Sequence, residues 1–220
     1  PKTMQPLIPY FSERKTEKMR LQCLRQQLKK APGQPNRSLS DFIAPIGVPD
    51  FIGSFAVSAG FNIEKMDAWF LQNLDDYQSI LLKALADRLA EALAEKIHEI
   101  VRKETWAYSK NESLESYDLI KEVYQGIRPA PGYPACPDHT EKEKLWSLLE
   151  VEKRTGITLT ESFAMYPAAS VSGWYFSHPD STYFGVGLIG KDQVLEYAKR
   201  KNMPVDVIER WLSPNLNYSI

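Results

Sequence analysis

Hydrophobic residues recur at helical spacing over most of the chain. Leu21, Leu24 and Leu28 fall on one side of residues 15–30, which predicts an amphipathic terminal helix. Further helical patterns follow, at residues 63–104, 114–124, 138–154, 191–202 and 204–212. Helices therefore make up most of the predicted structure.

The longest of these patterns, residues 63–104 with a break near residues 73–76, carries a regular apolar stripe. One apolar residue recurs at every fourth position of its second part: Tyr77, Leu81, Leu85, Leu89, Leu93, Ile97 and Val101. Side chains four residues apart lie on the same face of a helix. The stripe predicts that this is the main core helix, and alanines at positions 84, 86, 90, 92 and 94 allow close packing.

Short segments rich in β-branched and aromatic residues predict four strands, at residues 51–58, 158–165, 170–176 and 183–189. Strands and helices do not alternate as βαβ units, and no glycine-rich phosphate loop follows a strand, which argues against a Rossmann-type methyltransferase. The order of elements predicts an α+β fold with an antiparallel sheet flanked by helices, including one long core helix.

The start and the end of the predicted helix at residues 138–154 have their own signals. Asp138 and Glu141 are spaced as a capping box, in which each side chain accepts a hydrogen bond from the backbone of the other residue. Gly156 follows the pattern and is a good C-terminal stop. His139, in the first turn, has no histidine partner at metal-ligand spacing, so we interpret it as structural.

Residues 124–140, YQGIRPAPGYPACPDHT, concentrate the candidate binding chemistry. Four prolines within nine positions fix φ near −65° and favour a stiff, extended backbone. Arg128 can bind a carboxylate bidentately, Gly132 lets a ligand approach the backbone, and Tyr133 offers a flat ring and a hydroxyl. The alternative is an ordinary proline-rich surface loop with an arginine salt bridge.

Composition and charge exclude several function classes. The 220 residues are 43% hydrophobic, enough for a sizeable core, and the formal net charge of −1 gives no electrostatic footprint for nucleic acid or a membrane surface. No apolar run reaches the roughly 20 residues of a membrane span, and the N-terminus does not resemble a signal peptide. The two cysteines lack metal spacing, and free thiols are typical of a reducing compartment. We predict a cytoplasmic protein without a metal ion, nucleic acid or membrane as partner.

The literal sequence adds a resemblance to a known family. The string GIRPAPGYPACPDHTEK, residues 126–142, closely resembles the S-adenosylmethionine-binding signature of the activation domain of cobalamin-dependent methionine synthase. Further blocks resemble the same family in the same order, at residues 38–45, 83–99, 159–181 and 191–202. We therefore predict an N-terminal extension with an amphipathic helix, residues 1–35, and an activation-type domain, residues 36–220.

The resemblance implies a fold and a reaction. The family fold is a curved domain around a twisted antiparallel sheet, in agreement with the predicted class. The family domain binds S-adenosylmethionine and closes over the cobalamin-binding domain of methionine synthase when the cobalamin has been oxidised to inactive cob(II)alamin. A flavodoxin-type reductase supplies an electron, and the methyl group passes from sulfonium to cobalt. The two cofactors carry this chemistry, so no general base or nucleophile is expected.

The resemblance also assigns ligand contacts. They match six positions of this sequence: Glu91, Arg128, Ala130, Gly132, Tyr133 and Tyr183. Without the resemblance, Glu91 is better explained as a solvated charge on a helix, and Tyr183 as an ordinary cross-strand aromatic residue.

A run of small residues predicts the surface that meets the partner. Ala169, Ser170, Ser172 and Gly173 are expected to face the corrin of a cobalamin held by the partner domain, because a flat macrocycle needs a shallow surface. The alternative is a tightly packed crossing of two backbones, which also favours small residues.

One part of the family pattern is missing. The family domain has a further N-terminal segment with a ligand-contacting aspartate in an Asp-Trp context, and no match to it precedes residue 36. The chain is expected to be either a fragment or a short relative without this contact. The rival function is a non-catalytic docking module that caps cobalamin or recruits the reductase, with a weak ligand site.

Overall fold

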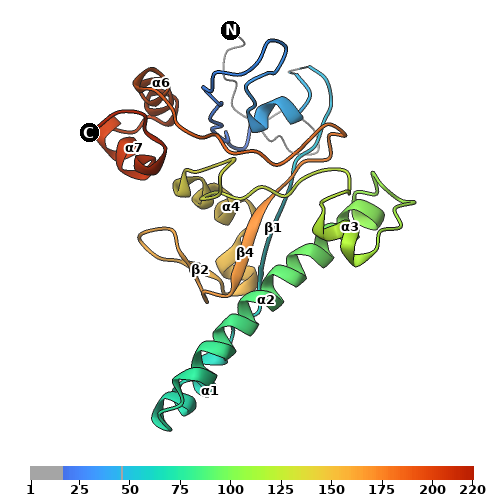
Figure 1. Ribbon diagram of the computed structural model, residues 1–220, viewed down its shortest axis with the longest axis vertical. Helices are drawn as coiled ribbons and strands as arrows, with labels where there is room; N and C mark the ends of the chain where they lie inside the picture. Colours follow the sequence, from blue (N-terminus) through green and yellow to red (C-terminus); the bar gives the residue numbers. More distant parts are fainter. Residues whose placement is uncertain (1–16, 46) are drawn as a thin grey trace. The chain divides into compact units, whose positions relative to one another are not determined.

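The computed structural model describes residues 17–45 and 47–220 (Figure 1). These residues divide into two compact units. Both units are built from segments that are distant in the sequence. In the described part of the chain, the first comprises residues 17–45, 47–53, 125–144 and 174–220, and the second comprises Ser54–Tyr124 and Leu145–Gly173. The predicted division between residues 35 and 36 separates an N-terminal extension from a family domain, whereas the two compact units are each built from separate segments. The predicted division stays a prediction.

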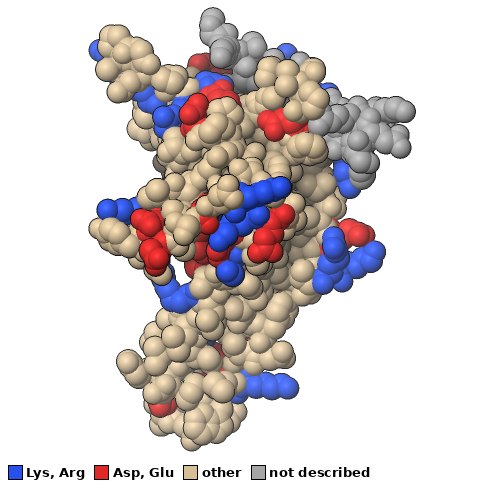
Figure 2. Space-filling view, turned by 90° about the vertical axis from the view of Figure 1, so that its right-hand side faces the viewer, with Lys and Arg blue, Asp and Glu red and all other residues tan. Residues whose placement is uncertain are grey.

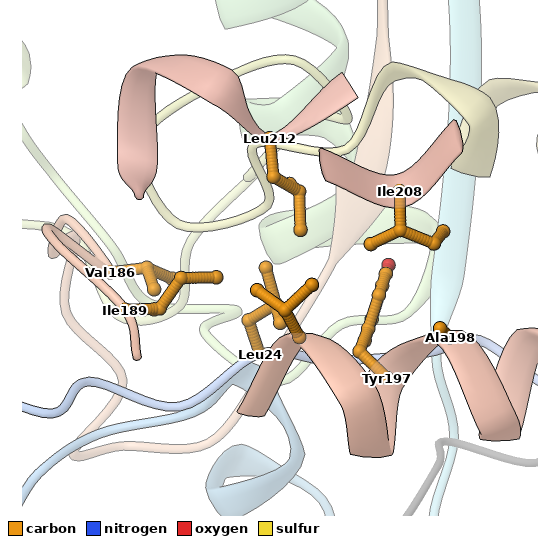
Figure 3. Close-up of a cluster of buried hydrophobic side chains, with 8 residues drawn as sticks. Leu24, Val186, Ile189, Tyr197, Ala198, Ile208 and Leu212 are labelled. Atoms are coloured by element: carbon orange, nitrogen blue, oxygen red, sulfur yellow. The ribbon is translucent and has the colours of Figure 1, made fainter. Parts of the chain in front are cut away.

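Helices α6, Lys191–Lys201, and α7, Val205–Trp211, supply most of the core of the first unit. The fully buried cluster consists of Leu24, Val186, Ile189, Val194, Tyr197, Ala198, Ile208 and Leu212. Figure 3 shows Tyr197 of α6 pointing toward Ile208 of α7, with Leu212 above Leu24, and Val186 and Ile189 beside them. This unit also contains three short 3-10 helices: Leu39–Phe42, His139–Glu141 and Ser213–Asn215. The two helices predicted near the C-terminus are therefore confirmed.

The helix predicted at residues 15–30 is wrong: from residue 17 to residue 30 the chain is extended, and residues 15 and 16 lie outside the described residues. Backbone groups of this segment form hydrogen bonds with residues far away in the sequence, where a helix would pair them with residues four positions apart. The Arg25 N–H donates to Gln193 Oε1 at 2.8 Å, and Gln193 Nε2 donates back to the Arg25 carbonyl at 2.8 Å. All four residues from 21 to 24 are buried, which leaves no polar face for an amphipathic helix.

The strand predicted at residues 183–189 is also wrong, although the segment is extended. Gly187 has a positive φ of 71°, which breaks the strand geometry. The hydrogen-bonding groups of this segment are used by loops and side chains: the Val186 N–H donates to the Pro134 carbonyl at 2.8 Å, and the Gly185 carbonyl accepts from Gln26 Nε2 at 2.6 Å. Only Ile189 pairs in a β-bridge, with Leu216.

The second unit consists of a helical hairpin and short strands. Its helices are α1, Ile63–Gln72, and α2, Asp76–Ile100, which ends in a π-helical turn at Val101–Thr105, followed by α3, Ser116–Ile120. Its strands are β2, Thr158–Leu159, β3, Met165–Tyr166, and most of β1, Gly53–Ser58, and of β4, Ser170–Tyr175. Strand β1 pairs with β4, and β2 pairs with β3 in an antiparallel hairpin where one longer strand was predicted. The α+β class is confirmed, with smaller sheets than expected.

The predicted helix at residues 138–154 is confirmed in outline, as helices α4, Lys142–Leu149, and α5, Val151–Thr155. Glu150 separates them with a positive φ of 50°, and Gly156 ends α5 with a φ of 79°. Asp138 is the N-cap, but its carboxylate accepts from the Thr140 N–H. The capping box also predicts that the Glu141 carboxylate accepts from the Asp138 N–H. This prediction is wrong, because the carboxylate accepts from the Gln22 N–H at 3.0 Å.

The apolar stripe expected to make α2 the main core helix is not the buried side of the helix, which is lined by alanines instead. The buried residues of α2 are Ser79, Ala86, Ala90, Ala94 and His98. The predicted stripe remains accessible over most of its length, and its exposed residues are Tyr77, Leu81, Leu85, Leu89 and Leu93. Within the described residues, no helix is long and apolar enough to cross a lipid bilayer.

Candidate functional site

The backbone of the proline-rich stretch is held by a short antiparallel ladder in the first unit. The Ile127 N–H donates to the Phe176 carbonyl at 3.0 Å, and the Phe176 N–H donates back to Ile127 at the same distance. One pair further along, the Trp174 N–H donates to the Pro129 carbonyl at 2.9 Å. Proline cannot donate to such a ladder but can accept at its edge. The ladder therefore fixes Arg128 between two anchored positions.

A tight turn follows at residues 130–133. The Tyr133 N–H donates to the Ala130 carbonyl at 3.2 Å, and Gly132, third in the turn, has a φ of 91°. Proline second and glycine third are the residues that a type II turn favours. The Gly132 N–H then donates to the Cys136 carbonyl at 2.7 Å, which closes the loop. We call residues 128–133 the signature turn.

Gly132 is required by its neighbour as well as by its backbone angle. A Cβ atom at this position would lie 2.7 Å from Nδ1 of His139. Real Cβ atoms do not approach other atoms this closely, so the imidazole occupies the space that any other residue would need. The sequence analysis expected a ligand to approach the backbone at Gly132, and this stays a prediction. Within this unit, the group beside Gly132 is the His139 ring.

His139 is itself packed from three sides. Lys142 Nζ lies 3.1 Å from its Nδ1, and its ring centroid lies 6.5 Å from that of Trp211. Burial, together with the charge of Lys142, lowers the pKa of His139 below its ordinary value, and Asp138 opposes this shift. The neutral ring is therefore the form that supports the signature turn, which confirms the structural interpretation of this residue.

The depressed pKa of His139 predicts a pH dependence of stability. The unfolded chain binds a proton at this residue below about pH 6.5, whereas the folded chain resists protonation, so the unfolding free energy should fall as the pH drops below that value. His139→Gln should flatten this part of the profile, measured by urea denaturation from pH 7.5 to pH 5. His178→Gln controls for removal of an imidazole elsewhere. An unchanged profile in His139→Gln would contradict this role.

A buried ionic network lies directly after the signature turn in the sequence. Lys201 Nζ donates to Asp138 Oδ2 at 2.5 Å and to Glu141 Oε1 at 2.9 Å, and the Tyr197 hydroxyl donates to Asp138 Oδ2 at 2.8 Å. Burial acts to raise the pKa of Asp138, but the charge and the hydrogen bond of Lys201 outweigh it and hold that pKa below its ordinary value. Sequence reasoning missed Lys201 because nothing in its helical pattern distinguishes it from a solvated lysine.

The structure brings four of the six predicted ligand residues together. Arg128, Ala130, Gly132 and Tyr133 belong to the signature turn, in which Ala130 is buried and Tyr133 is 54% exposed. Tyr183 joins them through its hydroxyl, which accepts a hydrogen bond from the Arg128 N–H at 3.0 Å. The tyrosine therefore holds the backbone at the arginine. Its predicted contact with a ligand stays a prediction.

Glu91 belongs to the second unit, where it is exposed on α2. It follows the buried Ala90, so it flanks the buried face of the helix. An exposed carboxylate at this position is accessible to a ligand. The same exposure is equally expected of a charge that is only solvated. Its assignment to the ligand site stays a prediction.

The four residues predicted to face a corrin are buried. Ala169, Ser170, Ser172 and Gly173 lie at the start of β4, and the Ala59 N–H donates to the Ala169 carbonyl at 3.0 Å. Burial of these small residues agrees with the alternative from the sequence analysis, in which two backbones cross in close contact. The cobalamin-facing assignment is untested and stays a prediction, but these residues do not form an open shallow surface here.

Cys136, whose carbonyl closes the loop after the signature turn, is not activated as a nucleophile. Cys136 could serve as a nucleophile only as a thiolate, and burial together with the nearby Glu141 raises its pKa well above the ordinary value. Across residues 17–45 and 47–220, no group of three histidine, cysteine or carboxylate side chains is arranged to hold a metal ion.

Comparison with known proteins agrees with this geometry. The sequence model of the family described as vitamin B12 dependent methionine synthase, activation domain, matches residues 7–202. The chain belongs to this family. The resemblance to this family that was inferred from residues 126–142 is confirmed.

A solved structure of the same family supports the fold. The MetH reactivation domain bound to AdoHcy shares 56% sequence identity with this chain, with a TM-score of 0.94. The alignment covers 97% of this chain and 66% of that chain, so this activation-domain chain spans slightly less than two thirds of the length of its solved relative.

Proposed function

We propose that this chain binds S-adenosylmethionine at the signature turn and serves the reductive reactivation of cobalamin-dependent methionine synthase. The observation that carries the proposal is the signature turn, formed by the residues that the family signature places there. The relative's ligand, AdoHcy, is the product left when S-adenosylmethionine loses its methyl group, which supports the same ligand class for this chain.

The protein's part in this function is binding and orientation. When bound, S-adenosylmethionine supplies the methyl group, and a cobalamin held by the partner domain accepts it after one-electron reduction by a flavodoxin-type reductase. Arg128 pairs with the ligand carboxylate, and the exposed Tyr133 ring covers a flat part of the ligand. Holding the methyl group close to cobalt is the contribution that accelerates the transfer. The chain is accordingly a module of a methyltransferase, with no activity of its own in isolation.

Arg128→Ala should weaken binding of S-adenosylmethionine about ten- to a hundredfold, because a charge-assisted hydrogen bond contributes roughly 1.5–3 kcal/mol. Arg128→Lys should recover only part of the loss, since an ammonium lacks the planar fork of the guanidinium. Isothermal titration calorimetry measures both, with far-UV circular dichroism to verify the fold. Arg154→Ala, an exposed arginine of the second unit, is the matched control. Equal affinities of Arg128→Ala and the parent would contradict the assignment.

Glu91→Gln should weaken binding of the cationic S-adenosylmethionine about tenfold if the carboxylate holds the positive end of the ligand. The neutral thioether AdoHcy separates the two possible contacts. An effect on S-adenosylmethionine alone indicates the sulfonium, and an effect on both ligands indicates the amino group. Asp87→Asn, exposed one turn earlier on α2, is the matched control. If both ligands bind Glu91→Gln as they bind the parent, Glu91 is only a solvated charge.

A further inference from the structure

Lys142, the first residue of α4, is buried, which is unusual for a lysine. Its exposed fraction is 6%. Figure 2 shows lysine and arginine side chains that project from the surface into solvent, the ordinary arrangement for these residues. Burial lowers the pKa of Lys142, an effect that Cys136 opposes. A lysine that is buried in spite of this effect is expected to have a specific hydrogen-bond acceptor.

His139 supplies such an acceptor. Lys142 Nζ lies 3.1 Å from His139 Nδ1, and the two residues are three positions apart, which places their side chains on the same side of the helical turn. An ammonium group only donates, so Nδ1 accepts in this contact and the proton of the neutral ring is on Nε2. Lys142 therefore selects one tautomer and one orientation of the imidazole.

The edge of the ring that Lys142 fixes also packs against the signature turn. A Cβ atom on Gly132 would lie 2.7 Å from Nδ1 and 2.9 Å from Nε2 of His139, so both ring nitrogens lie next to the glycine backbone. Trp211 of α7 packs near the imidazole, with ring centroids 6.5 Å apart. The contacts thus run from Lys142 through the imidazole to the turn, all within the first unit.

We propose that Lys142 is a positioning residue for the ligand site: it holds the neutral His139 ring against Gly132, so that the signature turn keeps the shape that binds S-adenosylmethionine. This inference rests on the proposed function. Lys142 does not need to touch the ligand in this role, because its effect on affinity passes through the imidazole. Side chains that bind a ligand depend on supporting contacts of this kind, which hold them in the productive geometry.

The same contact links ligand affinity to pH. Protonation turns both nitrogens of His139 into donors, so Nδ1 no longer accepts from Lys142 and two cations face each other. Burial and the charge of Lys142 lower the pKa of His139, and Asp138 opposes this shift, whereas Trp211 and Gly132 add no charge. The ring that supports the turn is the neutral one. Affinity should therefore be full above the folded-state pKa of His139 and should decline as the pH falls through it.

The test measures the affinity for AdoHcy by isothermal titration calorimetry from pH 7.5 to pH 5.5 in the parent chain, Lys142→Met and Lys142→Arg. Methionine keeps an unbranched side chain without the donor, and arginine keeps a donor and the charge. Lys199→Met, at an exposed lysine of α6, is the matched control. NMR follows the imidazole of His139 over the same pH range, with the signal assigned by His139→Gln. Urea denaturation verifies that each variant is folded.

At pH 7.5, Lys142→Met should bind AdoHcy about three- to tenfold more weakly than the parent, and Lys142→Arg should recover part of the loss. The pKa of His139 should rise in Lys142→Met, because the ammonium group no longer opposes protonation. The loss of affinity in acid should then begin at a higher pH than in the parent, and it should approach about tenfold at pH 5.5 as the pKa nears its ordinary value of about 6.5. A lysine with only a packing role would lower stability without moving this pH profile.

Three results would contradict the account, and they differ in what they overturn. An affinity and a pH profile of Lys142→Met equal to those of the parent would overturn the inference and leave the proposed function intact. A weaker affinity with an unchanged pKa of His139 would also overturn it, since Lys142 would then act without the imidazole. Absence of AdoHcy binding by the parent at pH 7.5 would contradict the proposed function, and with it the ligand role of Lys142.

Discussion

Gly132→Ala should disrupt the signature turn and lower the unfolding free energy by about 2–4 kcal/mol. Two effects combine at this position. The backbone has a φ of 91°, which strains any residue with a Cβ atom, and that Cβ atom would lie 2.7 Å from Nδ1 of His139. Because the turn positions Arg128 and Tyr133, affinity for S-adenosylmethionine should fall at least about tenfold. Urea denaturation and calorimetry measure the two consequences separately.

Two further variants separate strain from collision. Gly33 has a similar φ of 85° but no atom within 4 Å of its Cβ position, so Gly33→Ala measures the backbone strain alone. The double variant Gly132→Ala with His139→Ala removes the collision. Its loss of unfolding free energy should therefore be close to that of Gly33→Ala, because only the backbone strain remains. If Gly132→Ala costs no more stability than Gly33→Ala, the imidazole does not hold the turn as described.

Lys201→Met should lower the unfolding free energy by about 3–5 kcal/mol, because it leaves the carboxylates of Asp138 and Glu141 buried without their cation. The Lys201 side chain is only 5% exposed. Adding Asp138→Asn to Lys201→Met should restore part of the loss by removing one uncompensated charge. Lys191→Met, which breaks an ion pair to Glu209 at a lysine that is 51% exposed, should cost at most about 1 kcal/mol and is the matched control.

The effect of Lys201→Met should depend on pH in a defined direction. The pKa of Asp138 is held below its ordinary value, so the network stabilises the fold above about pH 4 and loses this contribution as the pH falls through the folded-state pKa. The pKa of Lys201 is raised, because Glu141 and Asp138 together outweigh its burial, so its charge persists at neutral pH. A cost of Lys201→Met no greater than that of Lys191→Met would show that the network contributes little.

The helical elements that the sequence predicted correctly are those in which local signals and tertiary contacts agree. The C-terminal helices have apolar residues at helical spacing, and those residues form the core of the first unit. Residues 17–30 have a similar spacing, yet their backbone pairs with side chains far away in the sequence, such as Gln193 and Glu141. Helical spacing alone cannot reveal such long-range partners.

The error on α2 has a different cause. The pattern located the helix and its apolar row correctly, but it could not show which side of the helix faces the interior. Alanines at positions 86, 90 and 94 allow close approach of a neighbouring element, and that side is the buried one. The larger leucines were taken as the core because large apolar residues usually are.

The candidate site was predicted in part because its residues are consecutive. A turn with proline second and glycine third is a local property, so Arg128, Gly132 and Tyr133 follow directly from the sequence. The residues that hold the turn in place, His139 and Tyr183, come from later segments, and their contacts to Gly132 and to the Arg128 backbone required the fold.

Calorimetric titration of this chain with AdoHcy, the ligand of its solved relative, tests the central claim most directly. The account predicts saturable binding at one site per chain that Arg128→Ala weakens about ten- to a hundredfold, while Arg154→Ala leaves it unchanged. Binding that is insensitive to Arg128→Ala would contradict the assignment of the signature turn as the ligand site. Absence of binding at millimolar ligand would contradict the proposed function itself.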